Sequence, residues 1–325
     1  MKRVIVLIII AALLSVFTGC RQNRNTVEQN QNGRITVITT IFPAYDFVRQ
    51  IAGDRVHLSM LLPPGAESHS FEPSPRDIIN ILNSDVFIYI GGEMERWIDR
   101  ILQSMNTDNM TILAMMNVVE TLEEEIVEGM ELDDDHDHDL DDGHDHDEDI
   151  VFDEHVWTYP GNVILIVRAI TELLSSVDPV NASFYRENAA SYIRELELLD
   201  KAFAEVVANA RRRTIILADR FPLRYFAAAY GLTYFAAFPG CSTETEASAA
   251  TVAFLIDRIR EENIPVVFHI ELSNERMADT ISAETGAQKL LFHSAHNISR
   301  RDFDSGIGYL DLMRANVENL RRALH

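Results

Sequence analysis

The chain has 325 residues, of which 24% are charged and 47% apolar, and these are the proportions of an ordinary globular protein. Its 51 acidic against 28 basic residues give a formal net charge of −23, which excludes a nucleic-acid partner because phosphate binding needs clustered Lys and Arg. Two cysteines exclude both a disulfide-stapled fold and a four-cysteine zinc site. The length indicates about two domains.

The first 20 residues, MKRVIVLIIIAALLSVFTGC, have the pattern of a bacterial export signal. Lys2 and Arg3 precede a short apolar run, and small residues come directly before Cys20. This ending resembles a lipobox, in which Cys20 is acylated and anchors the protein to the cell membrane. Residues 21–33 are polar and are expected to form a flexible tether. A transmembrane anchor is the alternative, but the apolar run is shorter than the roughly 18 residues that it needs.

Short β-branched runs alternate with segments of helical spacing from residue 34 to the C-terminus. Strands are expected at 34–40, 56–62, 85–90, 110–116, 214–219, 232–238, 264–272 and 288–294. Helical segments of about 10–15 residues lie between most of them. This alternation predicts βαβ units and an α/β fold with mainly parallel sheets flanked by helices.

The run 179–210 contains no glycine, and its only proline stands at its start, so it predicts one long helix of about 45 Å. We expect it to join an N-terminal α/β lobe at 34–178 to a C-terminal α/β lobe at 211–325. Proteins of this architecture bind ligands between the lobes, near the C-terminal ends of strands. The chain is expected to be a monomer.

An acidic segment at 121–149 interrupts the first lobe. It holds 16 Asp and Glu and no Lys or Arg, so the rest of the chain carries a net charge of only −7. Imidazole suits zinc, copper and nickel, and interleaved carboxylates attract cations. We therefore expect auxiliary, weak metal capture by a mobile loop, with a solvating acidic linker as the alternative. The histidines are His136, His138, His144 and His146.

Two single histidines lie in loops just before expected helices of the first lobe. His69 stands in GAESHSFEPSPRDI, and His155 stands in DEHVWTYP. Either alone is typical of a structural histidine. Because both belong to one lobe and His155 follows the His-rich segment, the pair favours a metal site.

These motifs, taken in order, resemble one known family. HSFEPSPRDI, VFIYIGGEMERW, the His-Asp run and DEHVW are similar to segments of the solute-binding lipoproteins of bacterial zinc and manganese ABC importers, the cluster A-I family. The resemblance extends from about residue 34 to the C-terminus, and the His-rich loop is typical of the zinc branch. It implies two lobes joined by a rigid helix, a metal ion held between them and a membrane permease as partner. It also implies that His69 and His155 are the two N-lobe ligands.

The C-lobe departs from the family pattern. Arg220 stands where the family usually has a His or Glu ligand, and arginine has no lone pair to donate to a cation. Its neighbour Asp219 is expected to substitute after a small register change. His293 aligns with the family's late acidic ligand and makes the site richer in nitrogen, which favours zinc over manganese. His296 is a second candidate at this place.

Several further polar residues are weaker candidates. Glu246 is either a direct ligand or a residue favoured by a helix dipole. Cys241 is expected to be a buried small side chain rather than a ligand. Glu271 follows a strand and is a weak candidate for the cleft. Asp153 and Glu154 are expected to orient the imidazole of His155.

The sequence therefore predicts an extracytoplasmic receptor, without enzymatic activity, that captures Zn²⁺ between two lobes and delivers it to an ABC importer. His69, His155 and His293 would bind the ion together with Asp219 or Glu246. Mn²⁺ or another metal is the alternative cargo. Because Arg220 is positively charged, it could form a salt bridge with a carboxylate, or the receptor could bind an anionic ligand or a metal chelate instead. A zinc-dependent hydrolase is disfavoured because the sequence has neither an HExxH motif nor a recognisable nucleophile motif.

Overall fold

The computed structural model describes residues 33–68, 71–104, 106–130, 151–242 and 247–325. The predictions for Cys20, the tether, His69, Glu246 and the four histidines of the acidic segment lie outside these residues. Ile35–His325 form the second of two compact units of the chain. The elements described below all belong to the second unit.

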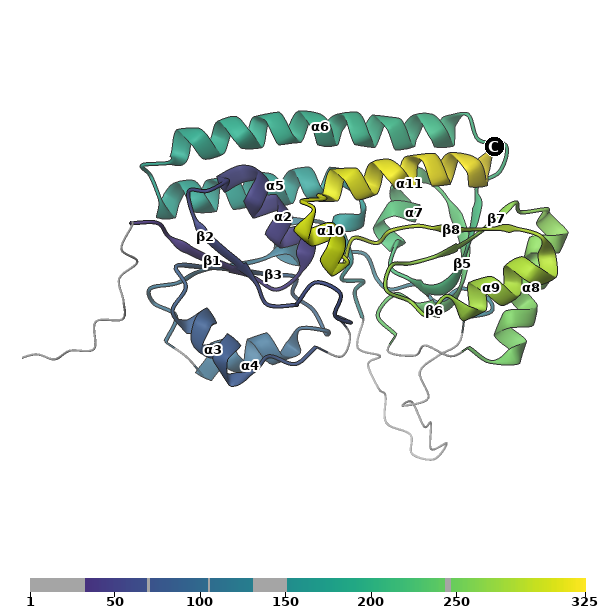
Figure 1. The fold of residues 1–325 in the computed structure, drawn as a ribbon, viewed down its shortest axis with the longest axis horizontal. Coiled ribbons are helices and arrows are strands. Elements are labelled where there is room, and N and C mark those ends of the chain that lie inside the picture. Colours follow the sequence, from purple (N-terminus) through teal and green to yellow (C-terminus); the bar gives the residue numbers. More distant parts are fainter. Residues whose placement is uncertain (1–32, 69–70, 105, 131–150, 243–246) are drawn as a thin grey trace, which may run out of the picture. The chain divides into compact units, whose positions relative to one another are not determined.

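The first sheet has four parallel strands in the order β2-β1-β3-β4. They are β1 (Thr36–Thr39), β2 (His57–Met60), β3 (Val86–Tyr89) and β4 (Thr111–Ala114). The helices of this lobe are α2 (Phe42–Ala52), α3 (Pro75–Leu82) and α4 (Arg96–Ser104). α3 and α4 cover one face of the sheet and α2 the other (Figure 1). α3 begins with a capping box, in which the side chains of Ser74 and Asp77 each accept a hydrogen bond from the other's backbone N–H.

The second sheet repeats this architecture, with parallel strands in the order β6-β5-β7-β8. They are β5 (Thr214–Phe221), β6 (Thr233–Pro239), β7 (Val266–His269) and β8 (Gln288–Leu291). Its helices are α7 (Arg224–Tyr230), α8 (Ala249–Glu262), α9 (Arg276–Thr285), α10 (Arg300–Asp304) and α11 (Tyr309–Leu324). β5 runs two residues beyond its predicted end and changes register between Leu217 and Arg220. Arg220 therefore lies in a strand, just past an irregularity.

Two helices follow the first sheet in the sequence, α5 (Pro160–Val177) and α6 (Ala182–Ala208). α5 is apolar and long enough to cross a membrane by length and composition, but half of it is buried inside the protein, where it packs against α6. α6 runs past both sheets (Figure 1) and contacts α2 of the first lobe and α11 of the second. Its buried side chains, among them Tyr185, Leu196 and Phe203, belong to a hydrophobic cluster that continues through both lobes.

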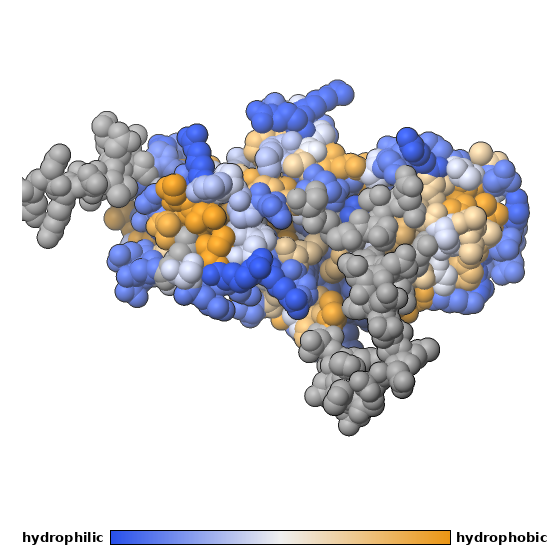
Figure 2. Space-filling model, turned by 90° about the horizontal axis from the view of Figure 1, so that it is seen from below, coloured by the Kyte–Doolittle hydropathy of each residue, from blue (hydrophilic) through white to orange (hydrophobic). Residues whose placement is uncertain are grey.

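Each of the eight predicted strands is present, and the predicted fold class is confirmed. The surface seen from below carries separate hydrophobic patches among hydrophilic side chains (Figure 2). The exposed large apolar residues include Ile79 and Leu82 of α3.

Candidate metal centre

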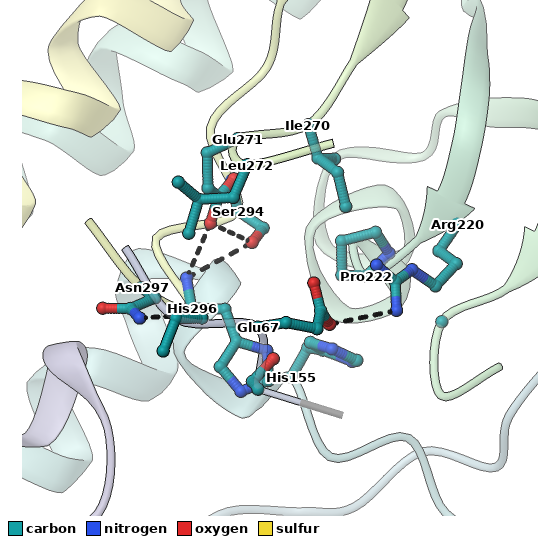
Figure 3. A pocket seen from close by; sticks show the side chains of 13 residues that line it. Glu67, His155, Arg220, Pro222, Ile270, Glu271, Leu272, Ser294, His296 and Asn297 are labelled. Atoms are coloured by element: carbon teal, nitrogen blue, oxygen red, sulfur yellow. Dashed lines mark hydrogen bonds and ion pairs between the residues drawn. The ribbon is translucent and has the colours of Figure 1, made fainter. Parts of the chain in front are cut away.

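A small cavity of about 30 Å³ lies where loops of the two lobes meet (Figure 3). The first lobe contributes Glu67 and His155, and the second contributes Arg220, Glu271 and His296. The last three come from the C-terminal part of β5 and from the segments that follow β7 and β8. Open α/β sheets bind ligands at this edge, and the volume suits one ion or one or two water molecules.

His155 is completely buried at the start of a 3-10 turn, η2 (Val156–Thr158), that leads into α5. Its backbone N–H donates a 2.8 Å hydrogen bond to Oδ1 of Asp153, and its Nδ1 lies 3.2 Å from the same oxygen. A carboxylate against one ring nitrogen fixes the orientation and tautomer of an imidazole, which is the arrangement of histidines that bind a metal ion through the other ring nitrogen. Asp153 is thus the predicted orienting partner. Glu154 is turned away and accepts a hydrogen bond from the backbone N–H of Met94.

The second imidazole of the pocket belongs to His296. Its ring centroid lies 5.5 Å from that of His155, and the two rings are inclined by 78°. Two imidazoles that bind one tetrahedral zinc ion place their centroids about 5 Å apart, so this spacing is compatible with a shared ion. The indole of Trp157 packs against both rings, at 5.4 Å from His155 and 5.0 Å from His296.

His293 lies outside the lining of this pocket. Its Nδ1 accepts a 2.9 Å hydrogen bond from the backbone N–H of Ala295, and its own N–H donates to Oδ1 of Asn316. Nδ1 of His293, the expected ligand, is therefore hydrogen-bonded within its own loop. The structure brings His296, the second candidate, next to His155 instead.

Glu271 holds this loop in shape. Its carboxylate accepts hydrogen bonds from the N–H of Ser294 at 2.7 Å, from the hydroxyl of Ser294 at 2.6 Å and from the N–H of His296 at 3.0 Å. Between these residues Ala295 has φ of +60°, a left-handed conformation that costs a residue with a side chain about 1 kcal/mol or more. Trp157 adds a bond from Nε1 to the carbonyl of Ser294. The position of His296 therefore depends on Glu271.

Arg220 is 6% exposed and faces two carboxylates. Its Nη1 donates to Oε1 of Glu67 and to the carbonyl of Ser242, each at 3.3 Å, and its Nε lies 3.9 Å from Oδ1 of Asp219. Arg220 therefore forms an ion pair with a carboxylate of the protein itself (Figure 3).

Asp219 does not reach the pocket of His155. It lines a neighbouring cavity of about 200 Å³ together with Arg220. Its Oδ1 accepts the backbone N–H of Arg220 at 2.9 Å, which keeps the carboxyl beside its own strand. Burial raises the pKa of Asp219, and the hydrogen bond from Arg220 opposes this. The expected substitution of Asp219 for the missing family ligand thus finds no support in the geometry.

Hydrogen bonds tie the loop that precedes His69 to the second lobe. The side-chain amide of Asn297 donates to the carbonyls of Pro63 and Ala66, at 2.9 and 2.8 Å. The N–H of Gly65 donates to the carbonyl of Ile298 at 2.8 Å. These bonds hold residues 63–66 at the pocket wall, directly before Glu67.

Two buried carboxyls lie behind the pocket. Glu95 accepts hydrogen bonds from the N–H groups of Ile90 and Gly91, and burial raises its pKa to about 7. Burial also raises the pKa of Glu154 to about 8, and the charge of Glu95 adds to this. Glu95 lines a second small cavity that also touches His296. No pattern in the sequence singles out Glu95, which stands three residues after Gly92.

Residues 37–323 match the sequence model of a family described as "Zinc-uptake complex component A periplasmic". The chain belongs to this family. The match covers nearly all of the second compact unit, including both sheets and the helices between them. The zinc branch of the predicted resemblance is confirmed.

Relatives support the same family. The high-affinity zinc uptake system protein ZnuA of Bacillus subtilis is 32% identical over 98% of this chain and 97% of its own length. The zinc-binding lipoprotein AdcA of Streptococcus pneumoniae is 29% identical over 97% of this chain, which spans 60% of that longer protein. The crystal structure of its Zn(II)-bound ZnuA-like domain covers 90% of this chain with a TM-score of 0.73 and 27% identity.

Of the predicted ligands that the structure describes, His155 lies in the pocket, whereas Asp219 and His293 do not. Glu67 was not singled out from the sequence, and Glu271 was only a weak candidate. The position of Glu67 two residues before His69 in the same loop is the signal that points to it.

Proposed function

We propose that this protein is an extracytoplasmic receptor that binds Zn²⁺ in the pocket between its lobes and delivers it to an ABC importer. The observation that carries the proposal is the pair of imidazoles, His155 and His296, 5.5 Å apart across a cavity of about 30 Å³. Neutral imidazole is a ligand that zinc prefers, whereas manganese favours carboxylate-rich sites. Membership of the zinc-uptake family supports zinc as the cargo.

The proposed ligands are His155 and His296, joined by His69 and by Glu246. His69 follows a loop that Asn297 ties to the second lobe. His293 and Asp219 are left out because their polar atoms bond to their own loop and strand. Four protein ligands leave no position for a reactive water, so the site would hold the ion without catalysis. This agrees with a receptor that is not an enzyme.

The proposal includes the predicted surroundings of the receptor. Cys20 would be the lipid attachment site at the cell membrane, and residues 21–33 would be the tether. His136, His138, His144 and His146 would capture metal weakly and pass it to the pocket. The protein would act as a monomer and would dock its permease partner when loaded.

Metal content and competition test this function. The purified chain is dialysed against buffer with excess Mn²⁺, and bound metals are counted by mass spectrometry. We expect one zinc per chain in the wild type and in a variant lacking residues 133–149, but none in His155→Ala. His325→Ala is the matched control, since this histidine contacts the carbonyl of Val206 at the C-terminus. Zinc that is lost with residues 133–149 but kept in His155→Ala would refute the proposal.

A further inference from the structure

A second group of metal-binding side chains meets His155 at a corner between the lobes. Asp153, His155 and Cys241 each offer one donor atom, and these three atoms lie within 4.8 Å of one another. Asp153 and His155 are almost completely buried, whereas Cys241 is partly exposed. A carboxylate oxygen, an imidazole nitrogen and a thiolate sulfur are the three kinds of donor that zinc uses in proteins.

A close backbone approach brings Cys241 to this corner. A Cβ atom at Gly240 would lie 2.8 Å from the carbonyl oxygen of Phe221 and 2.9 Å from Oδ2 of Asp153. Such distances leave no room for a side chain, so glycine is required for the turn to pack here. The backbone N–H of Cys241 donates a 2.9 Å hydrogen bond to Oε1 of Glu124, which fixes the turn against the first lobe.

The arginine in the pocket supports the same turn. Nη1 of Arg220 donates to the carbonyl of Ser242, the residue after Cys241, at 3.3 Å. Arginine cannot bind a cation, but here it holds the segment that carries a thiol. At the place in β5 where the family resemblance predicts a ligand, this chain thus has a residue that positions the turn after β6.

We propose that Cys241 supplies a thiolate ligand to the metal ion that His155 binds. This inference rests on the proposed function, and it gives to Cys241 the fourth position that the proposed function gave to Glu246. As the metal–sulfur bond forms, the S–H bond breaks and the proton passes to solvent, so the ion and its thiolate together carry one positive charge less than the free ion.

The geometry requires only a small adjustment. Zinc bonds of about 2.0–2.3 Å place tetrahedral donor atoms roughly 3.3–3.8 Å apart. The donor atoms of His155 and Cys241, which now lie within 4.8 Å of each other, must therefore approach by at most about 1 Å to reach the upper end of this range. A thiolate also discriminates against Mn²⁺, which prefers oxygen ligands.

Cobalt substitution tests this assignment on the full chain. A thiolate bound to Co²⁺ gives an intense charge-transfer band in the near ultraviolet. We expect this band at one Co²⁺ per chain in the wild type, and its loss in Cys241→Ser together with a fall in zinc affinity of more than about 100-fold. Cys20→Ser is the matched control and should keep the band, because it replaces the other cysteine of the sequence.

A second measurement needs no variant at Cys241. X-ray absorption at the zinc edge of the Cys20→Ser chain should show one sulfur at about 2.3 Å. Bound metal without sulfur, or a band unchanged in Cys241→Ser, overturns the assignment and leaves the receptor function standing. A chain that retains neither Co²⁺ nor Zn²⁺ overturns both.

Discussion

Replacing Glu271 by Gln tests whether this buried carboxylate determines the position of His296. The carboxylate accepts three hydrogen bonds, two from Ser294 and one from the N–H of His296. Glutamine keeps one accepting oxygen and presents an NH₂ group to one of these donors. A buried N–H left without a partner costs about 1–3 kcal/mol, and loss of the charge weakens the remaining bonds to about half. We expect a loss of about 2–4 kcal/mol in the free energy of unfolding.

Urea unfolding of the metal-free protein and zinc competition measure the two consequences. Zinc affinity should fall by about 10–100-fold, the range found when the partner of a metal ligand is lost. Glu284→Gln is the control, because this carboxylate is exposed and makes one long ion pair, so it should change stability by less than about 0.5 kcal/mol. Equal stability and affinity of Glu271→Gln and Glu284→Gln would refute the reasoning.

Three further predictions follow from the same contacts. His296→Ala should weaken zinc binding more than about 100-fold in a competition assay, while His293→Ala should change it by less than about 10-fold, because only the first faces the pocket. Glu95 has a pKa of about 7, above its ordinary value of 4.5, so the folded state retains a proton that the unfolded state has lost between these values. Through Glu95 the free energy of unfolding should therefore fall by about 3 kcal/mol as pH rises from 4.5 to 7, and urea unfolding of Glu95→Gln should show a shallower slope, because Glu154, with a pKa raised to about 8, still contributes its own share. Gly240→Ala should lower the melting temperature by several degrees in calorimetry, since its Cβ would crowd the carbonyl of Phe221.

Sequence patterns predicted the fold well because the strands of each sheet are short, β-branched and separated by helices. A parallel strand needs a crossover connection, so strand–helix alternation leaves few topologies. The end of β5 was predicted less well. The strand was expected to end at Asp219, but the register change after Leu217 lets it continue to Phe221.

The site was predicted in part. His155 stands in a loop before a helix, and such loops were the places where ligands were expected. The choice between His293 and His296 could not come from spacing, because it depends on the left-handed φ of Ala295, which turns the loop between them. That conformation is stabilised by Glu271, which lies more than 20 residues earlier in the chain. A contact between residues so far apart in the sequence produces no recognisable pattern in the residues around His293 and His296.

Arg220 is the residue whose positive charge conflicts most clearly with a metal site, and its surroundings explain why a cation still fits. The guanidinium lies 3.3 Å from Glu67 and 3.9 Å from Asp219, so carboxylates of the protein already oppose its charge. Glu271 adds a further acidic group to the same wall. An anionic ligand would have to displace these carboxylates from Arg220, whereas a divalent cation meets an excess of them. The pocket therefore favours a cation despite its arginine, and the coordinating atoms must come from the histidines and from the turn that Arg220 supports.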